Sequence, residues 1–293
     1  MQNAAYDVLV TLGIVDPQRI EHYADTVRDR SDISVKRCAK SGVIFLDNSA
    51  QAQEAYYVTK GDDSAAVQTL TETIPVTELE DTARRAEQFA SQIRGKNWID
   101  FGTGRGQILD ALKDVARSAT GVEPNELHRT NIAARGNIVV RSIGELPERS
   151  ADVITLFHVL EHLEDPVGLL RTIATRLVEG GRIVIEVPHA RDALLDLYDC
   201  QPFRQFTLWS EHLVLHTRES LRAVIEAAGL RCAAVTGYQR FPVSNHLHWL
   251  RTGRPGGHEK WSFLDAPALM EAYAAALNQV DATDTLIAYA SCG

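Results

Sequence analysis

Short apolar runs alternate with amphipathic segments through the middle of this chain. The predicted strands are residues 98–101, 119–123, 137–141, 152–157, 182–187 and 231–237. A helical pattern covers Thr77 to Ile93, and later helices are predicted to begin near Gln107, Asn125, Asp165 and Thr217. Strands that alternate with helices favour an α/β fold, in which a parallel sheet is covered by helices on both faces.

The flanking segments break this alternation. Residues 1–75 mix short apolar runs with polar loops, and we interpret them as a small N-terminal cap region. Residues 76–293 then form the main domain, with residues of about 240–281 as an inserted, partly helical lid. The apolar run at 285–290 is predicted to be a last strand.

A glycine-rich turn follows the first of the alternating strands. The strand ends at Asp100, glycines stand at Gly102, Gly104 and Gly106, and an amphipathic helix begins at Gln107. Glycines let the backbone approach a ligand closely, and the N-terminus of the helix offers unpaired N–H groups. The dinucleotide pattern G-x-G-x-x-G requires glycine where Gln107 stands, so a nicotinamide dehydrogenase is disfavoured.

The second strand ends in Gly-Val-Glu-Pro-Asn, residues 121–125. A carboxylate at this strand tip is able to accept hydrogen bonds from both ribose hydroxyls of an adenosine, and Glu123 is the predicted residue. The alternative is a solvated acid at the end of a strand. After the third strand comes Ser-Ile-Gly, residues 142–144, where Ile143 is expected to form an apolar wall beside an adenine ring.

These motifs together resemble those of class I S-adenosylmethionine (SAM) methyltransferases. The run Thr-Leu-Phe-His-Val-Leu-Glu-His-Leu-Glu-Asp-Pro, residues 155–166, resembles the fourth-strand signature of that family. The resemblance implies a Rossmann-like seven-stranded core with SAM as cofactor, and residues 285–290 as its reversed edge strand. It also implies that Phe157 and His158 line the methionine end of SAM, whereas His162 is expected to support the loop. The predicted cofactor-binding residues are Asp100, Gly102, Thr103, Gly104, Gly106, Glu123, Pro124, Ile143, Phe157 and His158.

Two further blocks, residues 185–189 and 209–221, resemble sugar methyltransferases of deoxysugar and surface-polysaccharide biosynthesis, including nucleotide-sugar C-methyltransferases. In that group a Tyr-x-Glu-His block supplies the catalytic base. Glu211 and His212 match it, while Trp209 replaces the tyrosine. A histidine suits proton abstraction near neutral pH. We therefore predict His212 as the base with Glu211 as its aid, and His189 as a further candidate. The alternative for His212 is a capping or packing role.

The N-terminal residues 35–46 resemble the start of the small zinc-binding domain of those C-methyltransferases. Ser41 stands where that domain has a second cysteine, and the four cysteines include no C-x-x-C pair. No metal is therefore predicted, and the thiols are expected to be reduced in the cytoplasm. Tyr56 and Tyr57 are candidate acceptor contacts, with buried packing as the alternative.

The net charge and the hydropathy of the chain limit the kinds of partner that it is expected to bind. The net charge of −9 disfavours a nucleic-acid partner held by bulk electrostatics. No apolar run is long enough for a membrane helix, and the N-terminal residues do not have the pattern of a secretory signal. A small-molecule acceptor in the cytoplasm is expected.

The sequence thus predicts a SAM-dependent methyltransferase that acts on a small polar acceptor, with a sugar or nucleotide sugar favoured. Two departures from the sugar C-methyltransferases, the missing C-terminal domain and the replaced tyrosine, leave O-, N- and C-methylation open. The alternatives are a methyltransferase for another small metabolite and a non-catalytic SAM-binding subunit of a partner enzyme.

Overall fold

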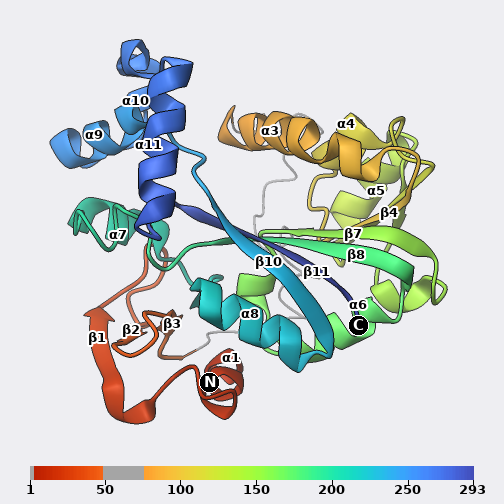
Figure 1. Ribbon diagram of the computed structural model, residues 1–293, viewed down its shortest axis with the longest axis horizontal. Coiled ribbons are helices and arrows are strands. Elements are labelled where there is room, and N and C mark those ends of the chain that lie inside the picture. The colour runs from red at the N-terminus through yellow and green to blue at the C-terminus, as the bar shows by residue number, and fades with distance from the viewer. Residues whose placement is uncertain (1–2, 49–75) are drawn as a thin grey trace.

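The computed structural model describes residues 3–48 and 76–293 (Figure 1). Tyr56 and Tyr57 lie outside this range, so the acceptor contacts expected of them stay predictions.

A seven-stranded sheet in the order β10-β11-β8-β7-β4-β5-β6 forms the centre of the molecule. Strands β4 to β8 pair in parallel with their neighbours, and β11 is antiparallel to both β8 and β10. The strands are β4 (Asn97–Phe101), β5 (Ser118–Val122), β6 (Ile138–Val140), β7 (Ala151–Phe157), β8 (Leu177–Pro188), β10 (Leu230–Tyr238) and β11 (Thr285–Cys292). All seven strands predicted from the hydrophobic pattern are present, and the Rossmann-like fold is confirmed.

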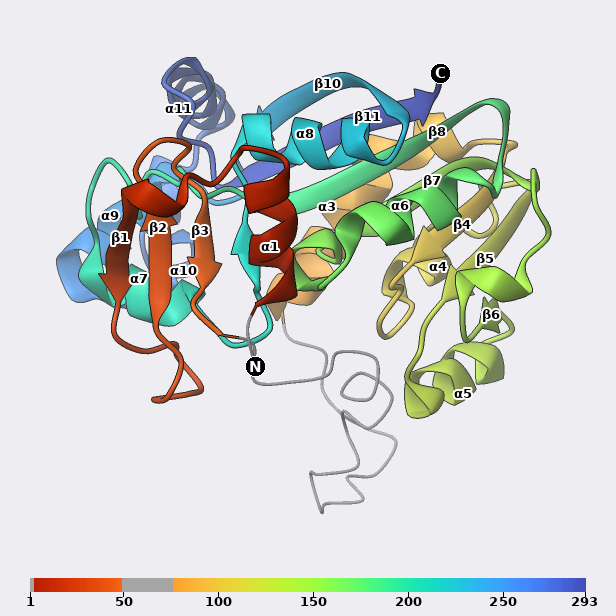
Figure 2. The same ribbon diagram turned by 90° about the horizontal axis from the view of Figure 1, so that it is seen from below.

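Helices cover both faces of this sheet (Figures 1 and 2). Helices α3 (Val76–Ile93), α4 (Gln107–Leu112) and α5 (Glu126–Ala134) lie on one face, and α6 (Pro166–Ala174) and α8 (Arg218–Ala227) lie on the other. Alternate strand residues enter the two layers: Trp98 packs in the cluster beneath α3 and α4, and its neighbour Ile99 packs in the cluster on the opposite side.

Side-chain caps are present at three of the four later helix starts that were predicted, and the start at Gln107 follows Gly106 and has none. Asn125 accepts a hydrogen bond from the His128 N–H, and Asp165 accepts one from Gly168 ahead of α6. The Thr217 side chain caps α8 by accepting from the Ser220 N–H. These caps satisfy N–H groups that lack a partner within the helix, which explains why the helices begin there.

One detail of the predicted topology is wrong. Strand β11 is reversed as expected, but it lies between β8 and β10 instead of at the edge of the sheet. Leu286, Ile287 and Ala288 are almost fully buried, as a strand covered on both faces requires. β10 takes the edge position, and its alternating buried and exposed residues fit that place.

The N-terminal residues form a second, four-stranded antiparallel sheet in the order β1-β2-β3-β9. Its elements are α1 (Ala4–Thr11), η1 (Pro17–Arg19), β1 (Ile20–Ala24), β2 (Val35–Cys38) and β3 (Ile44–Leu46). The fourth strand, β9 (Val214–Leu215), comes from the main domain and pairs with β3. The two parts of the chain are therefore joined by a shared sheet.

Further helices lie beyond the carboxyl end of β8 and between β10 and β11. Residues 240–281 contain α9 (Val243–Thr252), α10 (Gly257–Lys260), η4 (Ser262–Leu264) and α11 (Pro267–Gln279). The remaining elements are η2 (Ile143–Glu145), η3 (Leu160–His162) and α7 (Gln201–Thr207). Within residues 3–48 and 76–293, no helix combines the length and hydrophobicity needed to span a membrane.

Candidate active site

The glycine turn joins β4 to α4 and leaves room for a ligand. Gly102 and Gly104 have φ values of 74° and 56°, in the left-handed region that favours glycine. A Cβ atom on Gly102 would lie 2.5 Å from a methyl group of Val159, so the loop packs closely there. A Cβ atom on Gly104 would meet no atom within 4 Å. The backbone is therefore accessible at Gly104.

Glu123 lies directly opposite this loop, at the tip of β5. One carboxylate oxygen accepts a hydrogen bond from the Gly104 N–H at 2.9 Å, and the other accepts from the Asn125 N–H at 2.9 Å. Burial raises the pKa of Glu123, while these two donors oppose the rise. Each oxygen keeps acceptor capacity for one ribose hydroxyl. The residues present therefore fit the adenosine part of SAM.

Asp100, in β4, lies directly before the glycine loop and is buried beneath it. Its carboxylate is buried and accepts a hydrogen bond from the Thr155 hydroxyl at 2.6 Å. Burial raises the pKa of Asp100 to about 6, although hydrogen bonding to Thr155 opposes the rise. Gly102 and Thr103 donate backbone hydrogen bonds to the Val122 carbonyl, which fixes the loop against β5.

The remaining predicted cofactor residues surround the same edge of the sheet. Ile143 is buried at the start of η2, and Pro124 follows Glu123 directly. The Phe157 ring packs against Phe89 of α3 and lies beneath the Arg85 guanidinium. The individual contacts of these residues with SAM stay predictions.

His158 occupies a strained position immediately after β7. Its φ of 55° is uncommon for a residue with a side chain, and such outliers often mark functional sites. Its backbone N–H donates to the Glu186 carbonyl, and its Nδ1 lies 3.0 Å from a Glu161 carboxylate oxygen. Burial and the nearby Arg240 and Arg85 guanidiniums hold the pKa of His158 well below its usual range. The ring is therefore neutral near pH 7.

Ion pairs between two arginines of α3 and a glutamate of β8 lie beside His158. Arg84 donates to both Glu186 carboxylate oxygens, at 3.0 Å and 2.8 Å, and Arg85 donates to one of them at 2.6 Å. Burial alone would raise the pKa of Glu186, but the two guanidiniums lower it to about 2. Arg240, after β10, also binds Asp81 of α3, at 3.0 Å. These ion pairs connect the start of the main domain with residues at the carboxyl ends of β8 and β10.

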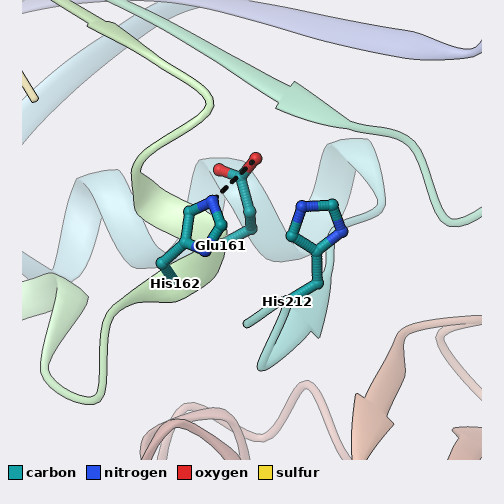
Figure 3. A group of neighbouring side chains, drawn as sticks. All are labelled: Glu161, His162 and His212. Carbon is teal, nitrogen blue, oxygen red and sulfur yellow. Dashed lines mark ion pairs between the residues drawn. The ribbon is translucent and has the colours of Figure 1, made fainter. Parts of the chain in front are cut away.

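Three side chains from two distant segments meet next to His158. Glu161 and His162 belong to η3, and His212 comes from the turn before β9 (Figure 3). One nitrogen or oxygen from each lies within 4.8 Å of the others. The His162 Nδ1 lies 2.9 Å from the Glu211 carbonyl, which only accepts, so Nδ1 carries the proton and Nε2 the lone pair. We call these three residues the Glu-His-His cluster.

Burial controls the charge of this cluster. It raises the pKa of Glu161 to about 8, and the nearby Glu186 carboxylate adds to the rise. Burial, with the neighbouring His162 and His158, also holds the pKa of His212 well below its usual range. Glu161 Oε2 and His212 Nδ1 are buried atoms without a hydrogen-bond partner in the described structure.

The structure places the other predicted catalytic residues differently. Glu211 contributes its backbone carbonyl, which orients His162. The His189 Nδ1–H donates to the Thr283 carbonyl at 2.9 Å, and burial lowers the pKa of His189 to about 4. His189 thus contacts the segment that precedes β11, an arrangement that favours a structural role. Its catalytic role, like that of Glu211, stays a prediction.

Sequence reasoning missed Glu161, Arg84, Arg85 and Arg240. Glu161 lies within the quoted run at 155–166, so its position was visible but its burial was not. The arginines of α3 look like an ordinary solvated helix face, because a sequence does not show that Glu186 lies opposite them.

Comparisons with known proteins agree with this geometry. A family model described as a methyltransferase domain matches residues 77–235, more than half of the chain. The ubiquinone biosynthesis O-methyltransferase of Aeromonas salmonicida is 26% identical over 167 residues, which are 52% of this chain and 70% of that protein. A probable S-adenosylmethionine-dependent methyltransferase of Mycolicibacterium smegmatis is 29% identical over 108 residues, 35% of this chain and 42% of that protein.

Solved structures share the fold. The 1,6-didemethyltoxoflavin-N1-methyltransferase of Burkholderia thailandensis, with bound S-adenosylhomocysteine, has a TM-score of 0.51 at 16% identity, over 86% of this chain and 95% of that one. The magnesium protoporphyrin IX methyltransferase of Synechocystis, also with the bound cofactor product, has a TM-score of 0.50 at 11% identity, over 82% and 98%.

Proposed function

Because this chain belongs to the methyltransferase domain family and uses SAM as its cofactor, we propose that it methylates a hydroxyl group of a small polar acceptor. The observation that carries this proposal is the Glu-His-His cluster, which follows β7. The carboxyl ends of the parallel strands β4, β5 and β7 meet at one edge of the sheet. The cluster therefore lies on the same side as the glycine loop and Glu123.

We assign cofactor binding and acceptor activation to different residues, according to their positions in the structure. Bound SAM supplies a methyl group that is already activated by its sulfonium. The glycine loop and Glu123 hold the adenosine, and the acceptor hydroxyl must then be aligned and made nucleophilic. We assign the activation of the hydroxyl to His212, whose neutral ring has a buried nitrogen without a partner.

The acceptor class is a further part of the proposal. The blocks at 185–189 and 209–221 support a sugar or nucleotide sugar, because they resemble sugar methyltransferases. The similarity to the Aeromonas O-methyltransferase supports methylation on oxygen. The two relatives share methyl transfer as their activity.

A panel of acceptors with ¹³C-methyl-labelled SAM tests this proposal. The panel contains nucleotide sugars, free glycosides and catechols, with amines and activated carbon acids as controls. We expect a product whose methyl carbon has the NMR shift of an O–CH₃ group. Labelled N–CH₃ or C–CH₃ products, with no O–CH₃ product, would contradict the proposal. Tight SAM binding without any product would instead favour the alternative of a non-catalytic SAM-binding subunit.

A further inference from the structure

The Glu-His-His cluster has the donor set of a metal centre. Two imidazoles and one carboxylate are ligands for Zn²⁺ and for Mn²⁺, Fe²⁺ or Co²⁺. Glu161 and His162 are adjacent in η3, and His212 approaches from the segment that leads into β9 (Figure 3). No metal was predicted here, because residues 161 and 212 are far apart along the chain.

The spacing of the donor atoms is close to that of a bound ion. Ligand atoms lie about 2.0–2.2 Å from zinc, so the ligand atoms of a tetrahedral site are about 3.3–3.6 Å apart. The donor atoms of the cluster all lie within 4.8 Å of one another. A movement of up to about 1 Å, shared between the side chains by rotation, brings them to the spacing of zinc ligands.

The hydrogen bond of His162 leaves the lone pair of the ring on its other nitrogen, as a metal ligand requires. Its Nδ1–H donates to the Glu211 carbonyl at 2.9 Å, so the lone pair is on Nε2, 3.9 Å from a Glu161 oxygen. Histidines that bind metals usually donate their second ring N–H to a carbonyl or carboxylate in this way.

Two buried atoms of the cluster also lack a partner. Glu161 is fully buried, its Oε1 faces His158 Nδ1, and its Oε2 has no hydrogen-bond partner in the described structure. His212 Nδ1 is in the same situation. Leaving a buried polar atom unpaired costs about 1–3 kcal/mol, so each such atom in a native structure calls for an explanation. Coordination of one cation would satisfy the Glu161 oxygen and a His212 nitrogen together.

We propose that Glu161, His162 and His212 bind one divalent transition-metal ion and that this ion coordinates the acceptor hydroxyl. Three protein ligands leave coordination positions open, as in catalytic metal sites. A metal-bound hydroxyl loses its proton to water more readily and becomes an oxygen nucleophile for the methyl group. This inference rests on the proposed hydroxyl methylation, and it makes His212 act through the ion that it holds.

Metal binding is tested on the full chain without any acceptor. Metal-stripped protein is titrated calorimetrically with Zn²⁺ alone, and the visible spectrum of the Co²⁺ form reports its ligands. We expect about one equivalent bound by the wild type, and binding at least about 10-fold weaker for Glu161→Gln, His162→Ala and His212→Ala. His22→Ala, which changes an exposed histidine paired with Asp25, is the control and should bind like the wild type. Circular dichroism checks that each variant is folded.

Absence of Zn²⁺ and Co²⁺ binding by folded wild type would overturn the proposal, as would equal binding by the wild type and all three cluster variants. The role in activation is tested separately, with the acceptor found in the panel. Metal-stripped enzyme should lose most of its rate while its SAM affinity stays constant, and added metal should restore the rate. A stripped enzyme with the full rate would overturn the role of the metal and leave hydroxyl methylation standing. A bound metal without any O–CH₃ product would overturn the methylation proposal alone.

Discussion

Single residues at the carboxyl edge of the sheet carry the roles in cofactor binding and acceptor activation that we propose. Glu123 was predicted from the end of its strand, and the structure places its carboxylate within hydrogen-bond distance of the Gly104 N–H. Its role in binding the ribose stays a prediction. The cluster around His212 was only half visible, because spacing along a chain does not reveal that Glu161 and His162 meet a residue from a later turn.

Replacing Glu123 by alanine should weaken SAM binding. Two hydrogen bonds to a charged carboxylate contribute about 1.5–3 kcal/mol each, so we expect the Kd to rise by at least roughly 100-fold. Calorimetric titration with SAM measures this. Glu126→Ala changes an exposed acid in the first turn of α5 and should bind SAM as the wild type does. Equal affinities for both variants would contradict the assignment of Glu123.

Asp192 makes the stability of the protein depend on pH. Its burial and the nearby Asp284 raise the pKa of this carboxyl to about 8. Between about pH 4 and pH 8 the folded state therefore keeps a proton that the unfolded chain releases, so stability falls as the pH rises. Asp192→Asn, which keeps an acceptor for the Leu194 N–H, should be the more stable protein at pH 8 by on the order of 3 kcal/mol.

Urea unfolding at pH 5 and pH 8 measures this difference. The two proteins should be similar at pH 5, where the wild-type carboxyl is protonated. A wild type that is as stable as Asp192→Asn at pH 8 would show that Asp192 is ionised in the folded state.

At the scale of elements, the sequence predicted each strand of the main sheet but not every neighbour. Hydrophobic alternation determines which segments are strands, whereas their order depends on contacts between distant segments. For this reason β11 was placed at the edge, and the pairing of β3 with β9 was not foreseen. That pairing matters for the site, because β9 begins two residues after His212.

Asn3 connects the N-terminal sheet to the segment that carries His212. Its side-chain amide donates to the Leu46 carbonyl at 2.9 Å and to the Leu213 carbonyl at 3.1 Å. We expect Asn3→Ala to lose about 2 kcal/mol of stability and to lower kcat several-fold with little change in SAM affinity. Thr11→Ala, an exposed change on α1, is the matched control. Unchanged stability and kcat in Asn3→Ala would show that this connection does not position His212.

At the scale of the whole molecule, the N-terminal sheet and the Rossmann-like core share one hydrophobic interior. A single cluster of buried residues includes Leu9 and Ile44 of the N-terminal part together with Ile154 and Leu221 of the main domain. The sequence predicted a small cap region at 1–75, and the described part of this region shares a sheet and a hydrophobic cluster with the main domain. Composition alone does not reveal this, because both parts have ordinary polar and apolar content.

Calorimetric unfolding should therefore show one cooperative transition for the full chain. The calorimetric and van't Hoff enthalpies should agree, since neither part keeps its core without the other. Two separated transitions would contradict this and would indicate that the N-terminal sheet folds independently.

The central claim is that the cluster at η3 activates the acceptor of a SAM-dependent methyl transfer. The most direct measurement compares the methylation rate and the SAM affinity of His212→Ala with those of the wild type, with His22→Ala as control. We expect a rate at least about 100-fold lower for His212→Ala at unchanged SAM affinity. A His212→Ala enzyme that turns over at the wild-type rate would contradict it.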